Sequence, residues 1–207
     1  MSKNKWTYYP DIDNMWELIN SGDDEIFKWV KKRVKKTLIS PLDEIKKRFD
    51  AEPSDHPIKQ IGLPVSMIIF CAIESFGRFL KGKGNQKRGG VAGQCFKAFI
   101  SNYMKEFERF KRKLWNGYRN CLTHGFRITE GRIRFLDKCC YPPEDSESGV
   151  LEIDLWKFFE KFKKAVIKYF DDINNKSDSK LKTKFISSFK SLYKYWIKYW
   201  KKRSLKQ

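Results

Sequence analysis

Histidine is scarce in this sequence: the chain has 207 residues and 2 histidines, His56 and His124. A site that needs two imidazoles is therefore hard to supply from one chain, which favours a site shared between two copies.

Cysteine is also sparse. The five cysteines lack the regular spacing of a disulfide framework, as is typical of free thiols in a reducing compartment. They are Cys71, Cys95, Cys121, Cys139 and Cys140.

Long apolar runs are missing as well. The longest, Val65–Ile73, is about half of the roughly 20 residues that a membrane-spanning helix needs. The start of the chain, MSKNKW, is polar and has no apolar stretch of the kind found in signal peptides. We therefore expect a cytoplasmic protein.

Acidic residues are rare in two segments, and the net charge of +19 comes almost entirely from them. Residues 61–135 carry 15 basic and 4 acidic groups, net +11, and residues 176–207 carry 11 and 1, net +10. Concentrated positive charge attracts a polyanion, most often nucleic acid, and an acidic membrane surface is the competing target. A basic surface that merely keeps the protein soluble is the alternative without a partner.

What the chain has in abundance is aromatic residues, 16% of the total, and they recur at helical spacing. The pattern predicts two or three short helices in residues 11–49, a core helix at Pro64–Leu80 and one long helix from residue 93 to Gly125. It also predicts a helix at Asp154–Asp172 and a basic aromatic helix in the tail. The alternation in residues 126–136 predicts a small β-hairpin that turns at Glu130–Gly131, with a possible third strand at Val150–Ile153.

These elements predict an all-α fold, an up-and-down bundle of four to five main helices with the hairpin inserted after the long helix. The chain divides into an N-terminal helical extension (1–60), a helical domain (61–175) and a basic aromatic C-terminal helix (176–207).

The stretch YRNCLTH near the end of the long helix brings together the candidate catalytic residues Arg119, Asn120 and His124. An imidazole can transfer a proton near neutral pH, and a guanidinium can bind two phosphate oxygens at once. These two groups suffice to cleave RNA without a metal. On an ideal α-helix, however, Arg119 and His124 are rotated apart by about 140°, so they converge only if the arginine curls round or the helix loosens near Gly125.

The motif resembles that of the HEPN superfamily, an arginine followed after four to six residues by a histidine, often with a polar residue directly after the arginine. The segment Ala72–Leu80 resembles the partner helix of such domains, and the resemblance covers roughly residues 60–175. It implies a helical bundle that dimerises to join two motifs in one cleft. It also implies metal-independent endoribonuclease activity that leaves a 2′,3′-cyclic phosphate, with Arg119 stabilising the phosphate, His124 as acid and base, and Asn120 orienting one of them.

HEPN domains are frequent in toxin–antitoxin and phage-defence systems, so RNA, a second copy of the chain and an antitoxin or defence-complex partner are the expected partners. Many are inactive, and a non-catalytic protein that binds nucleic acid or a nucleotide is the alternative. On a purely structural interpretation, Arg119 forms a salt bridge on a helix face and His124 caps the helix end. Glu74 and Arg78, one turn apart, either hold Arg119 in place or simply pair with each other.

Other patterns are weaker. Cys121, His124, Cys139 and Cys140 could bind zinc, but paired C-x-x-C spacing is missing, so we expect no metal and no cofactor. The loop KGKGNQKRGG lacks the ending of a phosphate-binding loop, although its Lys81, Lys83, Lys87 and Arg88 could hold an RNA backbone. The aromatic tail could stack bases, lie on a membrane, dock a partner or pack on the domain, and packing is the interpretation we favour.

Overall fold

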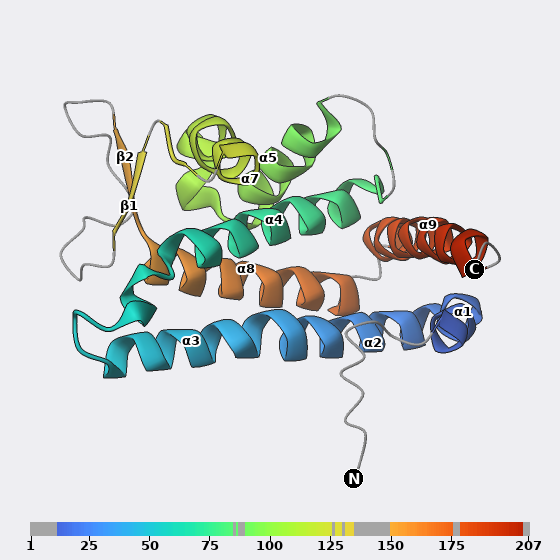
Figure 1. The fold of residues 1–207 in the computed structure, drawn as a ribbon. Helices are drawn as coiled ribbons and strands as arrows, with labels where there is room; N and C mark the ends of the chain where they lie inside the picture. Colours follow the sequence, from blue (N-terminus) through green and yellow to red (C-terminus); the bar gives the residue numbers. More distant parts are fainter. Residues whose placement is uncertain are drawn as a thin grey trace, which may run out of the picture.

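Helices form almost the whole of the described chain, as the apolar periodicity predicts (Figure 1). The computed structural model describes residues 12–84, 86, 90–125, 127–129, 131–134, 150–175 and 179–204. The longer helices are α1 (Ile12–Asn20), α2 (Asp23–Val34), α3 (Ser40–Ala51), α4 (Gly62–Lys81), α5 (Val91–Tyr103), α8 (Leu155–Asn175) and α9 (Ser179–Ser204). Shorter turns join them: η1 (Lys35–Ile39), η2 (Pro57–Gln60), η3 (Lys105–Phe110), α6 (Lys111–Lys113), η4 (Leu114–Asn120) and α7 (Cys121–Gly125). The predicted all-α fold class is confirmed.

The helices stack in layers around α8 and α4. Figure 1 shows α2, η1 and α3 as one continuous rod along one side, with α8 above it, α4 above α8, and α5 and α7 beyond α4. The π-helical turn η1 lets the rod run through without a loop. Helix α9 lies at one end of the stack, where it contacts α1, α2, α4 and α8.

Aromatic rings fill the centre, which explains the unusual composition. Phe76 of α4 lies with its ring centroid 5.6 Å from that of Phe99 in α5, 6.0 Å from Tyr169 and 5.9 Å from Phe170 in α8. All four side chains are buried. Each buried ring contributes about 2 kcal/mol relative to leaving it in water, so α4, α5 and α8 stabilise one another.

Helices α4 and α5 approach so closely that one position has no room for a side chain. A Cβ at Gly77 would overlap the carbonyl oxygen of Cys95 on the facing helix. Because a Cβ is held rigidly by the backbone of α4 and the oxygen belongs to the backbone of α5, neither can move aside without shifting a helix.

Gly77→Ala is therefore expected to lower the free energy of unfolding by about 2 kcal/mol, in spite of the better helix propensity of alanine. Urea unfolding measures this change. Ser75→Ala on the exposed side of the same helix is the matched control, and we expect it to stay within about 0.5 kcal/mol of the unmodified protein. Equal free energies of unfolding for the two variants would show that α4 and α5 lie further apart than the structure places them.

The single long helix predicted between residue 93 and Gly125 is wrong. Helix α5 ends at Tyr103, because Met104 takes φ −128° and ψ 55°, outside the helical region. The 3₁₀ turn η3 follows, and the chain then continues through α6 and η4 into α7. Beyond the break, Phe107 is buried against Phe158 of α8, with ring centroids 4.9 Å apart. The predicted end at Gly125 is the end of α7.

The predicted β-hairpin is also wrong. Strand β1 (Gly131–Arg134) pairs in parallel with β2 (Leu151–Asp154), in the register Gly131 to Leu151. The segment 127–129, which should have formed the first arm, is not a strand. The predicted third strand at Val150–Ile153 nearly matches β2.

Tyr118 explains this pairing. Its hydroxyl donates to the carbonyl oxygen of Leu151 and lies 3.3 Å from that of Arg132, so one buried side chain joins both strands to the motif helix. A Cβ at Gly131 would overlap the tyrosine ring.

The C-terminal helix packs on the body of the protein. Phe185 and Phe189 of α9 are buried, and their rings contact Phe27 and Trp29 of α2 with centroids 5.9 Å apart in both pairs. The packing interpretation of the tail therefore agrees with the structure for these rings. Contacts also cross the proposed boundaries at residues 60 and 176, since the ring of Phe27 lies against those of Phe170 and Phe185.

In the described part of the chain, α4 is the one helix long and apolar enough to cross a membrane by length and composition. In this fold 44% of that window is buried, and the helix carries Glu74 and Arg78 among its polar residues.

Candidate active site

The Arg119–His124 motif spans a change of helix type. Arg119 and Asn120 end the π-helical turn η4, and His124 lies in α7, which continues as α-helix to Gly125. A π-helical turn holds more residues than an α-helical turn, so each residue rotates the chain by less. Only the first of the five steps from Arg119 to His124 lies within η4, so the widening reduces their separation of about 140° only slightly. Within the described residues no hydrogen bond joins the two side chains.

The wide turn is held open by hydrogen bonds that an α-helix would not make. The thiol of Cys121 lies 3.1 Å from the carbonyl oxygen of Asn116, five residues earlier, and the amide of Thr129 donates to the carbonyl oxygen of Gly117 at 3.2 Å. The segment after α7 thus folds back onto η4. Such turns are frequent at functional sites.

The guanidinium of Arg119 is enclosed but not sealed, with 17% of its side chain exposed. It lies over the ring of Trp115, with its central carbon 4.8 Å from the ring centroid, and Nη1 donates to Thr123 Oγ1 at 3.3 Å. Nη2 donates to the Glu74 carboxylate. Nε is buried with no hydrogen-bond partner among the described residues. An unsatisfied buried donor costs roughly 1–3 kcal/mol and calls for an explanation.

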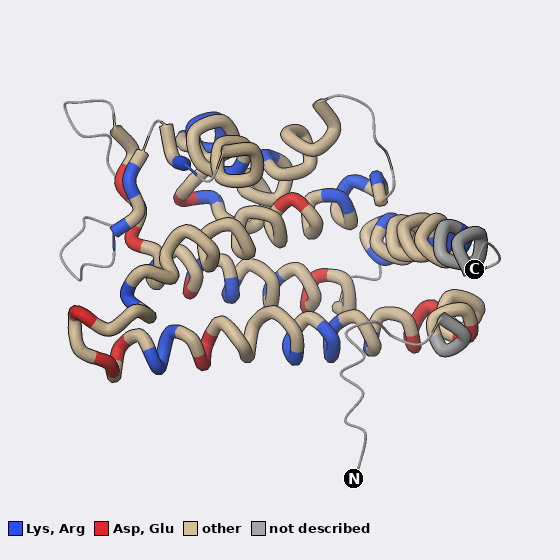
Figure 2. The backbone as a smooth tube through the Cα atoms, viewed as in Figure 1, with Lys and Arg blue, Asp and Glu red and all other residues tan. Residues whose placement is uncertain are grey.

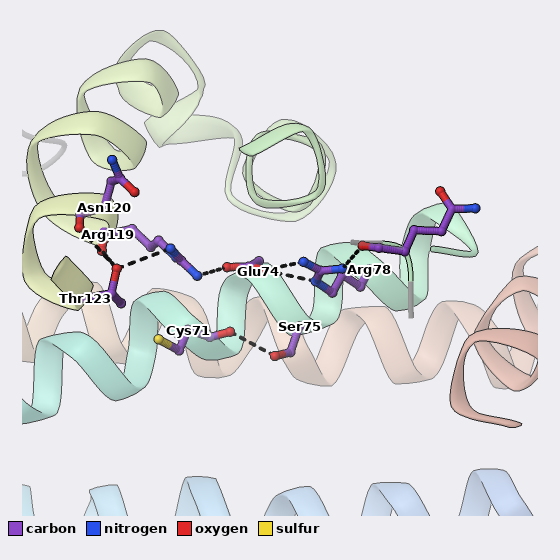
Figure 3. Close-up of polar contacts among 8 residues, drawn as sticks. Cys71, Glu74, Ser75, Arg78, Arg119, Asn120 and Thr123 are labelled. Atoms are coloured by element: carbon purple, nitrogen blue, oxygen red, sulfur yellow. Dashed lines mark hydrogen bonds and ion pairs between the residues drawn. The ribbon is translucent and has the colours of Figure 1, made fainter. Parts of the chain in front are cut away.

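Glu74 links Arg119 to Arg78 (Figure 3). Its Oε1 accepts from Arg78 Nε at 3.0 Å and from Nη2 at 2.9 Å, and its Oε2 accepts from Arg119. Arg78 Nη1 also donates to the carbonyl oxygen of Gln86 at 2.9 Å. One buried carboxylate between two guanidinium groups leaves this network with a net charge of +1 next to the motif. Glu74 and Arg78 thus pair with each other, and Glu74 also holds Arg119, so both sequence interpretations describe part of the arrangement.

His124 and Asn120 lie at the surface. Figure 3 shows the Asn120 amide directed away from the contact between Arg119 and Glu74. Within the described residues no hydrogen bond joins the Asn120 side chain to Arg119 or to His124. The orienting role expected for Asn120 therefore stays a prediction, whereas the His124 side chain is exposed to solvent.

The neighbouring thiols are not suited to nucleophilic chemistry. Burial raises the pKa of Cys71, and the charge of Arg119 offsets this only in part. Burial likewise raises the pKa of Cys95. Both groups therefore stay protonated near neutral pH. A thiol must lose its proton to react, so neither is suited to act as a nucleophile.

Within the described residues no group of three or more His, Cys, Asp or Glu side chains could hold a metal ion. Cys121 is near Thr129, with Sγ and Oγ1 3.2 Å apart, and Cys139 and Cys140 of the zinc alternative lie outside the described residues.

Two of the four predicted RNA-binding residues lie in the part of the chain that the structure describes. Lys81 is exposed at the end of α4 and Lys83 is partly exposed just beyond it, whereas Lys87 and Arg88 lie outside the described residues. The other histidine, His56, has a local role: its Nδ1 accepts from the amide of Ile58 at 3.2 Å and caps η2.

Sequence reasoning missed Trp115 and Thr123 as partners of Arg119. Both lie four residues from Arg119, one turn before and one turn after, so helical spacing alone could have indicated them. Gln86 had no such signal, because the loop conformation decides which carbonyl meets Arg78.

Comparison with protein-family models, with curated proteins and with solved structures finds no match for this chain.

Proposed function

We propose that this protein is a metal-independent endoribonuclease of the HEPN type, acting in phage defence or as the toxin of a toxin–antitoxin pair. The observation that carries the proposal is the arrangement of the motif. Arg119 is fixed by the buried carboxylate of Glu74 and retains an unsatisfied donor, while His124 stands in solvent one turn further along a locally widened helix. A positioned cation beside an accessible proton carrier is what cleavage at a phosphodiester requires.

In the proposed reaction the ribose 2′-oxygen attacks the adjacent phosphorus, and the bond from phosphorus to the 5′-oxygen of the next nucleotide breaks. One imidazole accepts the 2′-hydroxyl proton and another donates a proton to the leaving 5′-oxygen. The products are a 2′,3′-cyclic phosphate and a 5′-hydroxyl. The guanidinium of Arg119 would bind the phosphate oxygens as negative charge builds on them.

Because His56 caps η2, the second imidazole in this proposal comes from His124 of a second copy of the chain. The outward side of α4 offers a surface for such a dimer. Pro64, Ile68, Cys71 and Ser75 recur at three- and four-residue steps on that side, and Ile68 is 43% exposed. Glu74 lies on the adjoining side of the same helix, so two copies joined there would place their motifs near each other.

The purified protein is expected to cut labelled RNA in the presence of EDTA and to leave cyclic-phosphate ends. Light scattering should give a mass near twice 24.8 kDa. Cleavage that stops with EDTA and returns with added metal ions would contradict the proposed chemistry.

A second candidate is a non-catalytic nucleic-acid-binding protein of the same fold. The contact between Arg119 and Glu74 favours it, since a buried ion pair is also what a purely structural arginine would make. Salt-sensitive RNA binding without any cyclic-phosphate product would select this candidate. The membrane alternative has less support, because Phe185 and Phe189 of the tail are buried in the fold.

A further inference from the structure

The outer side of α9 carries a stripe of lysine and serine residues. Lys184, Ser187, Ser191, Lys194 and Lys198 recur at steps of three and four, and all five are exposed. At 1.5 Å per residue the stripe is about 21 Å long. No acidic residue occurs anywhere in α9, so nothing within the helix offsets this charge.

The opposite flank of α9 is already occupied. Lys182 pairs with Asp24, and Lys190 pairs with Asp23 at 3.0 Å, both at the start of α2. The aromatic side of the helix faces the core through Phe185 and Phe189. These contacts fix the rotation of α9 about its axis, and the remaining lysines consequently point outward as a set.

The end of α4 extends this stripe. A Cβ at Gly82 would lie 3.3 Å from Cγ of Lys184, so the lysine side chain lies against the chain between Lys81 and Lys83. Close by, the backbone at Gly84 touches that of Ser188, and Ser188 Oγ donates to the carbonyl oxygen of Arg78 at 3.3 Å. Figure 2 shows basic positions at the end of α4 beside the basic positions of α9.

We infer that these two segments, about 100 residues apart in the sequence, form one surface that binds the phosphate backbone of single-stranded RNA. We call it the α9 basic surface: Lys81, Lys83, Lys184, Lys194 and Lys198. Within the described residues no carboxylate pairs with any of the five. The inference rests on the proposed function for its choice of RNA. It assigns to α9 the binding of RNA outside the Arg119–His124 motif.

Chemistry favours RNA over an acidic membrane. Membrane-bound helices place aromatic and aliphatic side chains next to their lysines so that these enter the lipid. In α9 Phe185 and Phe189 point into the protein, and Ser187 and Ser191 lie between the lysines of the stripe. Leu192 and Tyr195 are the large apolar side chains exposed in the described part of the helix, at 38% and 45%, and two such groups are few for a helix that enters lipid. Small polar residues between cations suit a phosphate backbone, which binds through charge and hydrogen bonds.

The test uses the full-length chain carrying His124→Ala, so that RNA is bound without being cut. Lys184→Gln/Lys198→Gln is compared with Lys182→Gln/Lys190→Gln, which removes the same charge from the flank paired with α2. The probe is a labelled single-stranded RNA of mixed sequence, with affinity measured by fluorescence anisotropy across a salt titration. Vesicles containing phosphatidylserine form a second arm.

The outer double variant is expected to lose about tenfold in affinity at physiological salt, and the slope of log K against log salt should fall by about 1.4. The flank variant should lose much less. Equal losses in both variants would overturn the inference, as would binding to vesicles that exceeds binding to RNA and disappears with Lys184 and Lys198. RNA cleavage by the protein with native His124 is measured separately. Normal cleavage without the expected binding difference would contradict the α9 basic surface alone, whereas absence of cleavage would contradict the proposed nuclease activity.

Discussion

Alanine in place of His124 is expected to slow RNA cleavage by at least about a hundredfold, because proton transfer by a positioned side chain contributes roughly 10²–10⁴-fold. The imidazole is exposed, so its removal should change the free energy of unfolding by no more than about 0.5 kcal/mol. Single-turnover cleavage in EDTA, followed by urea unfolding of the same preparation, measures both effects.

His56→Ala is the matched control, since it removes the only other imidazole and leaves the motif untouched. It should cleave RNA at the unmodified rate and lose about 1 kcal/mol of stability with the cap of η2. If His124→Ala cleaves as fast as His56→Ala, the imidazole has no part in the reaction and the binding-protein candidate takes precedence.

The elements that the sequence predicts well are those whose apolar side faces one partner throughout. Helix α8 runs Leu155–Asn175 against a predicted 154–172, because Phe158, Phe162 and Tyr169 all point into the same core. The segment after residue 93 has equally regular spacing, yet it breaks at Met104. Periodicity indicates that a side chain is buried, but it does not indicate against which helix, and the contact of Phe107 with Phe158 of α8 has no signal in the spacing.

The hairpin failed for a related reason. Local alternation in residues 126–136 predicted a strand after a turn at Glu130–Gly131, and β1 (Gly131–Arg134) lies there but begins within the predicted turn. The turn residues favoured the nearest pairing. The actual partner, Leu151–Asp154, is about 20 residues away, and the Tyr118 hydroxyl reaches both strands from η4. A single long-range hydrogen bond of this kind has no signature in a local window.

In the candidate site, the sequence identified the residue types but not their connections. Glu74 and Arg78 were recognisable as a pair from their four-residue spacing on an apolar helix, whereas Arg119 lies 45 residues beyond Glu74. Their contact depends on how α4 packs against η4 and α7. Helix packing sets this geometry, and single-sequence patterns do not specify it.

Glu74→Gln is expected to lower the free energy of unfolding by about 3 kcal/mol, since it leaves two guanidinium groups beside a neutral amide in a largely buried site. The side chain of Glu74 is 10% exposed, and those of Arg119 and Arg78 are 17% and 25% exposed, so water cannot fully replace the lost partner. Asp43→Asn makes the same chemical change at the more exposed pair with Lys163 and should cost less than about 1 kcal/mol. Urea unfolding compares the two.

Stability alone would not separate a positioning role of Glu74 from a structural one. Below the unfolding transition, Glu74→Gln should reduce kcat with little change in KM, because the carboxylate contacts Arg119 rather than RNA. The same change made in Arg119→Ala protein should reduce the rate no further, since the group that Glu74 positions is already gone. Additive losses from the two changes would show that Glu74 acts on the fold as a whole. If Glu74→Gln lowers the cleavage rate only when Arg119 is present, the carboxylate acts by positioning the Arg119 guanidinium.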